Sequence, residues 1–406
     1  MSWLLIATSS PPMPSPSSAS YGDRSAVAAG SVAHAVHDGL TDLVYVLLPV
    51  WQQQFLLPYA VVGLLRGAYS GAMASCQLTM SRLALRFGRR RLLLAGTVLT
   101  GCAYLLASQA LGLYTLLLAL VLGGLGASTQ HPLASALVAD SQRDETRMRQ
   151  ALAHYNFAGD VGKMALPALT GIGLAYVGWR YSLLGAGALG LAAAGLLAWL
   201  LPKDAAPTAQ GAKRSAKEAG GAHGGLTPLL LTGFLDTAAR SGFMTFLPFL
   251  LQAHGAGKAA IGLALSLLFV GGAFGKLACG YLGARIGMMR TVWLSETATS
   301  LMIALALIVP LWALWLLLPP LGLVLNGTST ALAGTVPAVS GKESRERGFA
   351  RFYTVTIGAG AIAPVLFGAL SDRVGLTDAL LTLAAVLLLT LPLSWKVEQA
   401  LTNPGA

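Results

Sequence analysis

Charged residues are scarce in this sequence. Asp, Glu, Lys and Arg together make up 11% of its 406 residues, whereas apolar residues make up 55%. An ordinary soluble domain is about 25% charged, so this composition excludes a soluble globular protein. Cysteine is also rare, and the three that occur, Cys76, Cys102 and Cys279, all fall within apolar segments. They therefore predict no disulfide framework.

The motifs of ATP-driven pumps and of common hydrolases are missing. A phosphate-binding loop needs Gly-x-x-x-x-Gly-Lys-Ser/Thr, and the segment around Lys342 has neither the first glycine nor a hydroxyl directly after the lysine. Neither Gly-x-Ser-x-Gly nor His-Glu-x-x-His is present. We therefore expect that the protein is not an enzyme, and the pattern predicts no cofactor and no metal site.

The start of the chain lacks the features of a cleavable signal peptide. Such a peptide has a basic start followed by an apolar run, whereas this chain has no Lys or Arg before Arg24. The apolar run at residues 3–7 is too short, and the segment is rich in Ser and Pro. We expect residues 1–25 to form a disordered cytoplasmic tail.

What the sequence has in abundance is apolar segments. A transmembrane helix needs roughly 20 mostly apolar residues, and twelve such segments with short connections fill the chain. We predict an all-α membrane protein with twelve transmembrane helices. The predicted spans cover residues 26–52, 57–80, 91–109, 112–138, 151–177, 180–201, 227–252, 258–284, 289–309, 311–337, 347–370 and 376–397.

The basic residues between these spans lie on alternate connections. With both termini in the cytoplasm, the cytoplasmic segments carry 20 Lys and Arg, and the outer connections carry only Arg180, Lys258 and Arg373. Cytoplasmic connections are enriched in Lys and Arg, so this asymmetry favours a multi-pass protein with both termini inside. The net charge of +11 then reflects topology and attraction to anionic lipid headgroups, and it requires no nucleic acid.

The second half of the chain repeats the first. A shift of 199 positions places Arg86 on Arg285 and Gly88 on Gly287 without gaps. Six spans, a linker and six further spans in parallel repeat are the layout of secondary transporters that rock around a central site. The predicted domains are a six-helix bundle at 26–201, a cytoplasmic linker at 202–226, a six-helix bundle at 227–397 and a cytoplasmic tail at 398–406.

The repeated connections resemble the loop signature of the major facilitator superfamily, roughly Gly-x-Leu-Ala-Asp-Arg-x-Gly-Arg-Arg/Lys. Residues 81–91 and 280–290 carry the two copies, and Leu85 and Ala284 replace the family's Asp. The resemblance implies the twelve-helix fold and gating loops, while the replaced acid argues against the latch that the family forms there. Residues 368–375 fit the signature on an outer connection, and we interpret them as a turn. The predicted gating residues are Arg86, Gly88, Arg89, Arg90, Arg285, Gly287 and Arg290.

Within the superfamily, three segments resemble the fosmidomycin-resistance branch. They are His34-Ala-Val-His37-Asp38-Gly39, Gln130-His131-Pro132 and the stretch at residues 156–163. This resemblance implies a proton-driven exporter of small molecules in a bacterial cytoplasmic (inner) membrane. The third segment contains two charged residues, Asp160 and Lys163, which we do not expect from that branch.

Ionisable side chains within the spans are the candidates for function. Such a residue costs about 2.5–3.5 kcal/mol at a helix centre on insertion scales, and those that persist usually face a cavity. His34, Asp38 and Asp42 follow at four-residue steps, which places them on one helix face. Burial disfavours a charged carboxylate and a neighbouring cation favours it. We predict that Asp38 is the proton site, with Asp42 second and His34 beside it. The alternative is that Asp38 or Asp42 forms a static ion pair with Arg66 or Lys163, which only holds the helices together.

Other polar residues in the spans predict the substrate site. Arg suits carboxylates and phosphonates because its planar group donates two parallel hydrogen bonds. The basic residues therefore favour an anionic or zwitterionic substrate, although the five acids in the spans are able to neutralise them. The side-chain amides of Gln130 and Asn326 have an alternative role, which is to hydrogen-bond the backbone of their own helices. The predicted substrate-binding residues are Arg66, Gln130, His131, Lys163, Asp236, Arg240, Lys276 and Asn326.

Together these observations predict a proton-coupled secondary transporter that moves a small organic solute or drug by alternating access. Efflux by antiport is our first interpretation, and proton-coupled import is the main alternative. A third is efflux of a thiol-reactive metalloid through the three cysteines, although buried cysteine usually serves packing.

We expect Gly63, Gly67 and Gly71 to pack helices closely within one bundle, and we predict a monomer whose partners are solute, protons and lipid.

Overall fold

The computed structural model describes residues 21–142, 144–201, 225–340 and 345–402, and these residues fold into α-helices without a strand. Most of the predicted N-terminal tail and linker lies outside the described residues, whereas residues 21–25 and 398–402, which we predicted to belong to the tails, are helical. The domain limits stay a prediction. The helices are α1 (Tyr21–Phe55), α2 (Tyr59–Phe87), α3 (Arg89–Ser108), α4 (Leu113–Ala127), α5 (Gln130–Asp140), α6 (Glu145–Tyr176), α7 (Gly178–Leu200), α8 (Leu226–Ala253), α9 (Lys258–Ile286), α10 (Met288–Ala306), α11 (Leu311–Val339), α12 (Arg345–Val374), α13 (Leu376–Leu387) and α14 (Thr390–Thr402).

These helices form twelve rods in the described part of the chain. Two rods are interrupted: α4 and α5 are separated at Ser128 and Thr129, and α13 and α14 are separated at Leu388 and Leu389. Each of these pairs still forms one apolar segment of membrane-spanning length. The rods coincide with the twelve predicted spans, and several extend a turn or two beyond the predicted ends. The prediction of an all-α, twelve-helix protein is confirmed.

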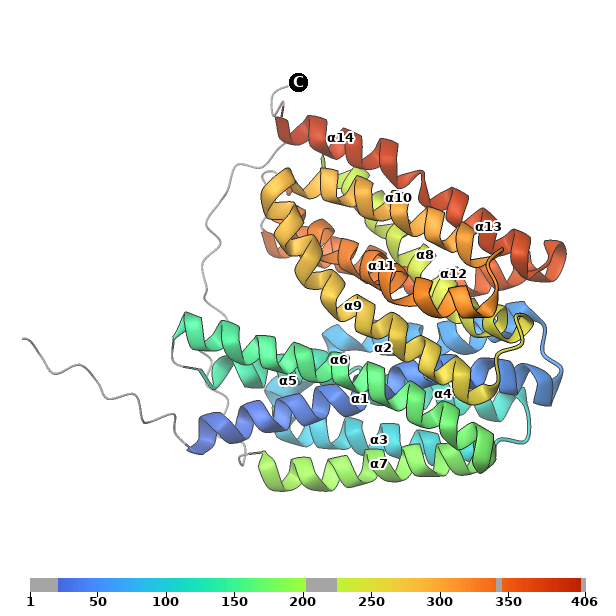
Figure 1. Cartoon of the computed structure of the whole chain (residues 1–406). Helices are drawn as coiled ribbons and strands as arrows, with labels where there is room; N and C mark the ends of the chain where they lie inside the picture. Colours follow the sequence, from blue (N-terminus) through green and yellow to red (C-terminus); the bar gives the residue numbers. More distant parts are fainter. Residues whose placement is uncertain (1–20, 143, 202–224, 341–344, 403–406) are drawn as a thin grey trace, which may run out of the picture.

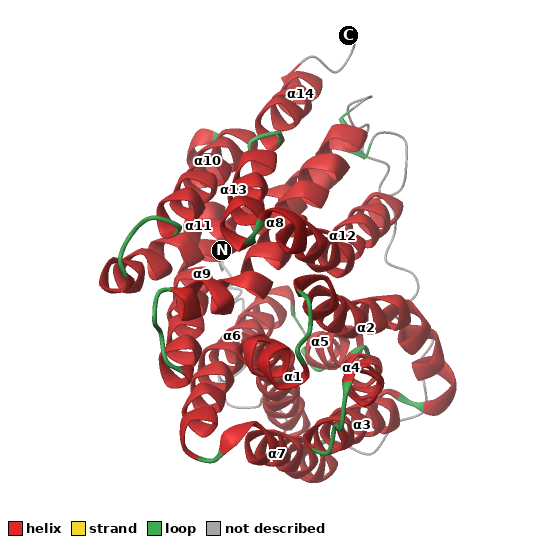
Figure 2. Ribbon diagram, turned by 90° about the vertical axis from the view of Figure 1, so that its right-hand side faces the viewer, coloured by secondary structure: helices red, strands yellow, loops and turns green. Residues whose placement is uncertain are grey.

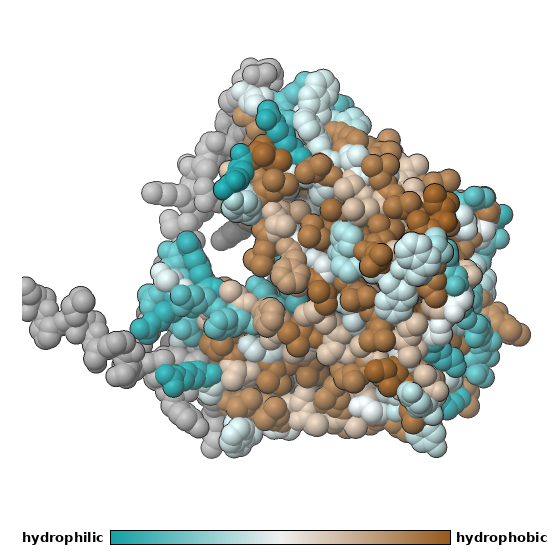
Figure 3. Space-filling view, viewed as in Figure 1, coloured by the Kyte–Doolittle hydropathy of each residue, from teal (hydrophilic) through white to brown (hydrophobic). Residues whose placement is uncertain are grey.

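Seven of the described rods are long and apolar enough to cross a membrane by length and composition alone. The other five are α1, α2, α6, α8 and α10, and each carries an ionisable residue within its apolar stretch. In a bilayer such residues must face other protein groups or water. Figure 3 shows apolar residues across the middle of one face and hydrophilic residues toward the two ends of the helices, as expected for a molecule surrounded by lipid.

The rods are arranged in two groups. Helices α1–α7 pack mainly against one another, and α8–α14 do the same. Figure 1 shows the first group below the second, and Figure 2 shows both groups nearly end-on. Two helix pairs make most of the contact between the groups: α2 packs against α12, and α6 packs against α9. Every helix of either group is thus held by its own bundle, and only these two crossings join the bundles extensively.

Glycines set the distance between the bundles. A Cβ atom at Gly63 of α2 would overlap the carbonyl oxygen of Pro364 in α12, and Gly67 faces the same helix. The pair formed by α6 and α9 is equally close, because a Cβ at Gly171 would lie 2.8 Å from the Cα of Gly262. Residues larger than glycine would push the bundles apart at these points. We predicted packing within one bundle for Gly63 and Gly67, and that prediction is wrong: they contact the other bundle.

The bundles meet closely at one end of the molecule, where α1 joins α2 and α8 joins α9; we call this the closed end. Residues 42–49 of α1 and 242–251 of α8 are all buried. Across the bundle boundary, the ring of Tyr59 lies edge-on to the rings of Phe246 and Phe249. We call the other end, where α1 begins and α14 ends, the open end.

A carboxylate joins the two bundles at the closed end. Asp372, in the last turn of α12, accepts hydrogen bonds from the backbone N–H groups of Tyr59 (2.7 Å) and Ala60 (2.8 Å) in the first turn of α2. The N-terminus of a helix has unpaired N–H groups and a partial positive charge, and a carboxylate satisfies both. Residues 368–375, which we interpreted as a turn, therefore also connect the bundles.

We expect Asp372→Ala to open the closed end more often. Loss of a helix cap costs about 1 kcal/mol, which corresponds to a shift of roughly fivefold in a two-state equilibrium. In a cysteine-free background with Met244→Cys in the cavity, a membrane-impermeant thiol reagent added at the closed end should label about fivefold faster. Asp378→Ala, an exposed acid on the neighbouring helix α13, is the matched control. Unchanged labelling in Asp372→Ala would contradict the expected role.

Candidate functional site

A cavity of about 630 Å³ lies between the two bundles. Its lining comes from α1, α2, α5 and α6 on one side and from α8, α9, α11 and α12 on the other. Lining residues toward the open end, such as Asn156 and Thr330, are exposed, whereas the closed end is buried. Nine of the eleven residues predicted for proton coupling or substrate binding line this cavity: Asp38, Asp42, Arg66, His131, Lys163, Asp236, Arg240, Lys276 and Asn326.

The two other predicted residues do not line the cavity. Gln130 is fully buried and donates a hydrogen bond from Nε2 to the Tyr155 hydroxyl (2.9 Å). His34 is 6% exposed and lies next to Tyr155. Sequence periodicity placed both on the right helices but could not show that both pack against Tyr155 of α6.

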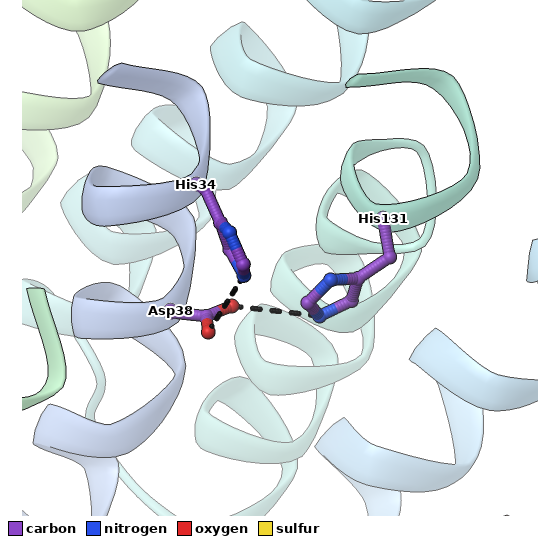
Figure 4. Close-up of side chains that lie close together, drawn as sticks. All are labelled: His34, Asp38 and His131. Atoms are coloured by element: carbon purple, nitrogen blue, oxygen red, sulfur yellow. Dashed lines mark ion pairs between the residues drawn. The ribbon is translucent and has the colours of Figure 1, made fainter. Parts of the chain in front are cut away.

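Asp38 is the centre of the most highly connected cluster. Its Oδ2 lies 3.0 Å from His34 Nε2 and 3.1 Å from Lys163 Nζ, and its Oδ1 lies 3.4 Å from His131 Nε2. Figure 4 shows the two imidazoles converging on the carboxylate from α1 and α5. Three potential proton donors from three helices thus surround one carboxylate whose side chain is only 7% exposed.

The orientation of His34 is fixed by its surroundings. Nδ1 lies 2.8 Å from the carbonyl oxygen of Tyr155, so this nitrogen must carry a proton to donate. The imidazole stacks on the Tyr155 ring with centroids 4.0 Å apart. A Cβ at Gly159 would come within 2.6 Å of the imidazole, so glycine makes room for it. Because Nδ1–H is already used, the contact between Nε2 and Asp38 requires one further proton, on either His34 or Asp38.

The cluster of His34, Asp38 and His131 also has the residue types of a metal site, with possible ligand atoms within 4.8 Å of one another. The Lys163 ammonium, however, lies 3.1 Å from an oxygen of Asp38. A cation in the centre of the cluster would be repelled by this neighbouring positive charge. The arrangement therefore suits the binding of protons better than the binding of a metal ion.

Asp42 lies one turn further along α1, opposite Arg66 of α2. The distance between Arg66 Nη2 and Asp42 Oδ1 is 3.7 Å, and the same nitrogen donates to the Tyr45 hydroxyl at 2.8 Å. Nη1 donates to the carbonyl oxygen of Thr41 (3.3 Å), and the guanidinium carbon lies 4.2 Å from the centre of the Tyr45 ring. These contacts commit Arg66 to a local structure within the first bundle.

The second bundle contributes Asp236 and Arg240 from α8. Arg240 makes a long hydrogen bond of 3.5 Å to the hydroxyl of Thr237, its buried Nε has no hydrogen-bond partner, and no ion pair joins it to another described residue. A guanidinium that lines a cavity with unused donors is suited to bind an anion from the cavity. The Nε of Arg66 is also buried without a partner, but its two other nitrogens contact groups of its own bundle, so Arg240 is more available to a ligand than Arg66.

Sequence reasoning left one buried acid out of the site. Glu296 of α10 is 1% exposed, and its carboxyl group lies close to the carboxyl group of Asp236. Oε1 of Glu296 has no hydrogen-bond partner among the described residues. The available signal was a glutamate in mid-helix among hydroxyl residues, but the sequence alone could not pair α10 with α8.

The predicted gating residues make contacts within their own bundles in this structure. Gly88 and Gly287 adopt positive φ angles of 86° and 96°, so each joins two helices without a longer loop. Arg89 pairs with Asp140 at 2.5 Å. Arg90 donates to the carbonyl oxygens of residues 198 and 201 and thereby caps the end of α7. Arg290 lies 3.5 Å from Glu398, while Arg86 and Arg285 lie over aromatic rings of their own helices.

The three cysteines differ in their exposure. Cys76 is partly exposed, Cys102 is exposed and Cys279 is buried. None of the three lines the cavity. The side chains that face the cavity therefore offer oxygen and nitrogen atoms and the thioethers of Met73 and Met244, and they offer no thiol.

Comparisons with known proteins agree with this architecture. The family model of the Major Facilitator Superfamily matches residues 30–226 and 229–404. Over 144 residues the chain is 31% identical to the drug efflux pump JefA of Mycobacterium tuberculosis, in strains CDC 1551 / Oshkosh and H37Rv. That match covers 34% of this chain and 27% of the relative's length.

Solved structures match over almost the whole chain. The crystal structure of a bacterial homolog to the human lysosomal transporter Spinster, inward-facing and unoccupied, has a TM-score of 0.78 at 15% identity and covers 96% of this chain and 99% of its own. The crystal structure of a mutant of the nucleoside transporter NupG has a TM-score of 0.70 at 14% identity and covers 95% of this chain and 100% of its own. At these identities the likeness concerns the fold.

Proposed function

Because the chain belongs to the major facilitator superfamily and is a multi-pass membrane transporter, we propose that it exchanges protons for a small organic solute across a bacterial cytoplasmic membrane and exports that solute. The observation that carries this proposal is the placement of Asp38. This carboxylate lines the cavity between the bundles and contacts His34, His131 and Lys163.

The contacts of Asp38 support reversible proton binding. A buried carboxylate is stable as an anion only while cationic or donor groups surround it. His34 Nε2 and His131 Nε2 provide two sites that accept or give up a proton, and Lys163 provides a fixed charge. A solute that changes the position of Lys163 changes the stability of the anion. Proton and solute binding at the cavity are thereby linked.

The substrate that fits best carries an anionic group and is itself anionic or zwitterionic. Arg240 lines the cavity with a buried, unpartnered Nε and no ion pair among the described residues. Arg66, Lys163 and Lys276 are paired with acids of the protein, so these three are largely neutralised. A carboxylate or phosphonate group on the solute would complete the hydrogen bonds of Arg240.

Efflux is the preferred direction, and import is the alternative. The similarity to a drug efflux pump over 144 residues favours efflux. The distribution of Lys and Arg favours both termini in the cytoplasm, in which case the open end faces the cytoplasm and is ready to load a solute from inside. Efflux of a thiol-reactive metalloid is disfavoured, because no cysteine lines the cavity.

Inside-out membrane vesicles test this function. With a proton gradient formed by respiration, an exported solute should accumulate in vesicles that contain the protein, and the accumulation should disappear when a protonophore is added. Carboxylates, phosphonates and zwitterionic drugs form the first panel of candidates. Solute that accumulates only in right-side-out vesicles would identify import, and transport that is insensitive to the protonophore throughout the panel would contradict proton coupling.

A further inference from the structure

Four charged residues connect the proposed proton site to the other bundle. Lys163 Nζ lies 3.1 Å from Asp38 within the first bundle, and Lys276 Nζ of α9 lies 2.6 Å from Asp160 Oδ1 of α6. Asp160 and Lys163 are three residues apart on α6, so their side chains lie on neighbouring positions of one helix face. The signs alternate along the whole series: Asp38 negative, Lys163 positive, Asp160 negative and Lys276 positive.

The pair formed by Asp160 and Lys276 is an ion pair between the bundles. It lies on the open-end side of the contact in which the Ser266 hydroxyl donates to the carbonyl oxygen of Met164 (2.5 Å). The Asp160 side chain is 14% exposed and the Lys276 side chain is 42% exposed. A change in this ion pair therefore acts on the contact between the two bundles.

We propose that Lys163 carries the protonation state of Asp38 to the ion pair that joins the bundles, with Asp160 as the positioning residue. This inference rests on the proposed proton coupling at Asp38. The pairing of Asp160 with Lys276 does not follow from the sequence, in which the two residues are 116 positions apart.

The order of the proposed steps follows from the change in charge at Asp38. While Asp38 is an anion, Lys163 stays with it, and Asp160 is free to hold Lys276 of the other bundle. When a proton from water in the cavity neutralises Asp38, Lys163 loses its partner there and turns to Asp160, one helical turn away. Asp160 then shares its charge between two ammonium groups, so its hold on Lys276 weakens and the bundles move apart at the open end of the α6–α9 contact.

Other charged groups around Asp38 are placed to let this exchange occur. His34 and His131 contact the same carboxylate and relay protons to it. Asp42 also lies near Lys163, but it faces Arg66 at 3.7 Å and belongs to the same bundle, so a move of Lys163 toward Asp42 does not reach the other bundle. Lys163 is 29% exposed, which leaves its long side chain room to move between the two acids.

The test compares Asp160→Asn with Glu145→Gln in proteoliposomes that contain the full chain. Glu145 is also an acid of α6 in an ion pair, but its partner Arg149 lies on the same helix at 2.7 Å. We expect Asp160→Asn to lower pH-gradient-driven uptake by about tenfold or more, within the range of known coupling energies, while downhill solute exchange continues. Glu145→Gln should keep both activities. Wild-type uphill transport in Asp160→Asn would overturn the inference.

The charge swap Asp160→Lys with Lys276→Asp separates coupling from simple attachment of the bundles. The swap restores an ion pair between α6 and α9 but places a cation beside Lys163, which then has no acid at position 160 to turn to. We expect the swap to recover the thermal stability of the wild type while pH-gradient-driven uptake stays lost. Recovery of that uptake would show that Asp160 only fastens the bundles. If the proposed proton-coupled transport itself were wrong, the wild type would show no pH-driven uptake, and this outcome differs from every outcome that concerns Asp160.

Discussion

Asp38→Asn is expected to abolish uphill transport and to leave downhill solute exchange. A pH difference of about one unit is worth about 1.4 kcal/mol per proton, enough for a solute gradient of roughly tenfold with one-for-one exchange. Asparagine has the size of aspartate but binds no proton, so this gradient should fall to unity. Uptake by proteoliposomes with and without a pH difference measures both activities in the same preparation.

Asp378→Asn is the matched control for Asp38→Asn, since Asp378 is exposed at the closed end and remote from the cavity. It should retain the full solute gradient. Asp38→Asn leaves Lys163 and two histidines without their anion, so the thermal stability of the purified variant should be measured alongside transport. A variant that folds, exchanges solute and still builds a tenfold gradient would place the proton site at another residue.

Arg240→Gln is expected to raise the KM for an anionic solute by about tenfold to a hundredfold. A hydrogen bond to a charged group is worth about 1.5–3 kcal/mol, and every 1.4 kcal/mol is a factor of ten in affinity. Arg240 is the cavity-lining arginine without an ion pair among the described residues, so a bound anion would depend on it. Concentration-dependent exchange, which does not require a pH difference, measures KM directly.

Two further variants make the Arg240 result specific. Arg24→Gln removes an exposed arginine at the start of α1, far from the cavity lining, and should leave KM unchanged. Arg240→Lys retains the charge but loses the planar pair of donors, so it should give an intermediate KM. A KM that stays at the wild-type value in Arg240→Gln would contradict a role for this residue in anion binding.

The helices and the charged residues of the cavity lining followed from the sequence because both depend on local patterns. Apolar runs predicted the twelve rods, since a lipid environment forces each span to satisfy its backbone within a helix. Charges within those runs predicted the cavity lining, since a buried charge needs a polar neighbour. Asp38, Asp42 and Arg240 line the cavity as the sequence predicted.

The sequence suggested Arg66 and Lys163 as ion-pair partners of Asp38 and Asp42, and the structure pairs them. The other partners could not be read from the sequence, because partners on different helices have no fixed spacing. Asp160 and Lys276 belong to different bundles, and Glu296 meets Asp236 from another helix. The glycines at positions 63 and 67 have the spacing of close helix packing, but spacing does not say which helix approaches. Likewise, Gln130 lies on the predicted helix but donates to Tyr155 of another helix and does not line the cavity.

The most direct measurement concerns the release of protons when solute binds to the purified protein. In a weakly buffered solution with a pH-sensitive dye, solute should displace about one proton per wild-type molecule, and the Asp38→Asn variant should bind solute without releasing it. Binding of solute to the wild type with no change in pH would contradict exchange of solute and proton at the shared cavity.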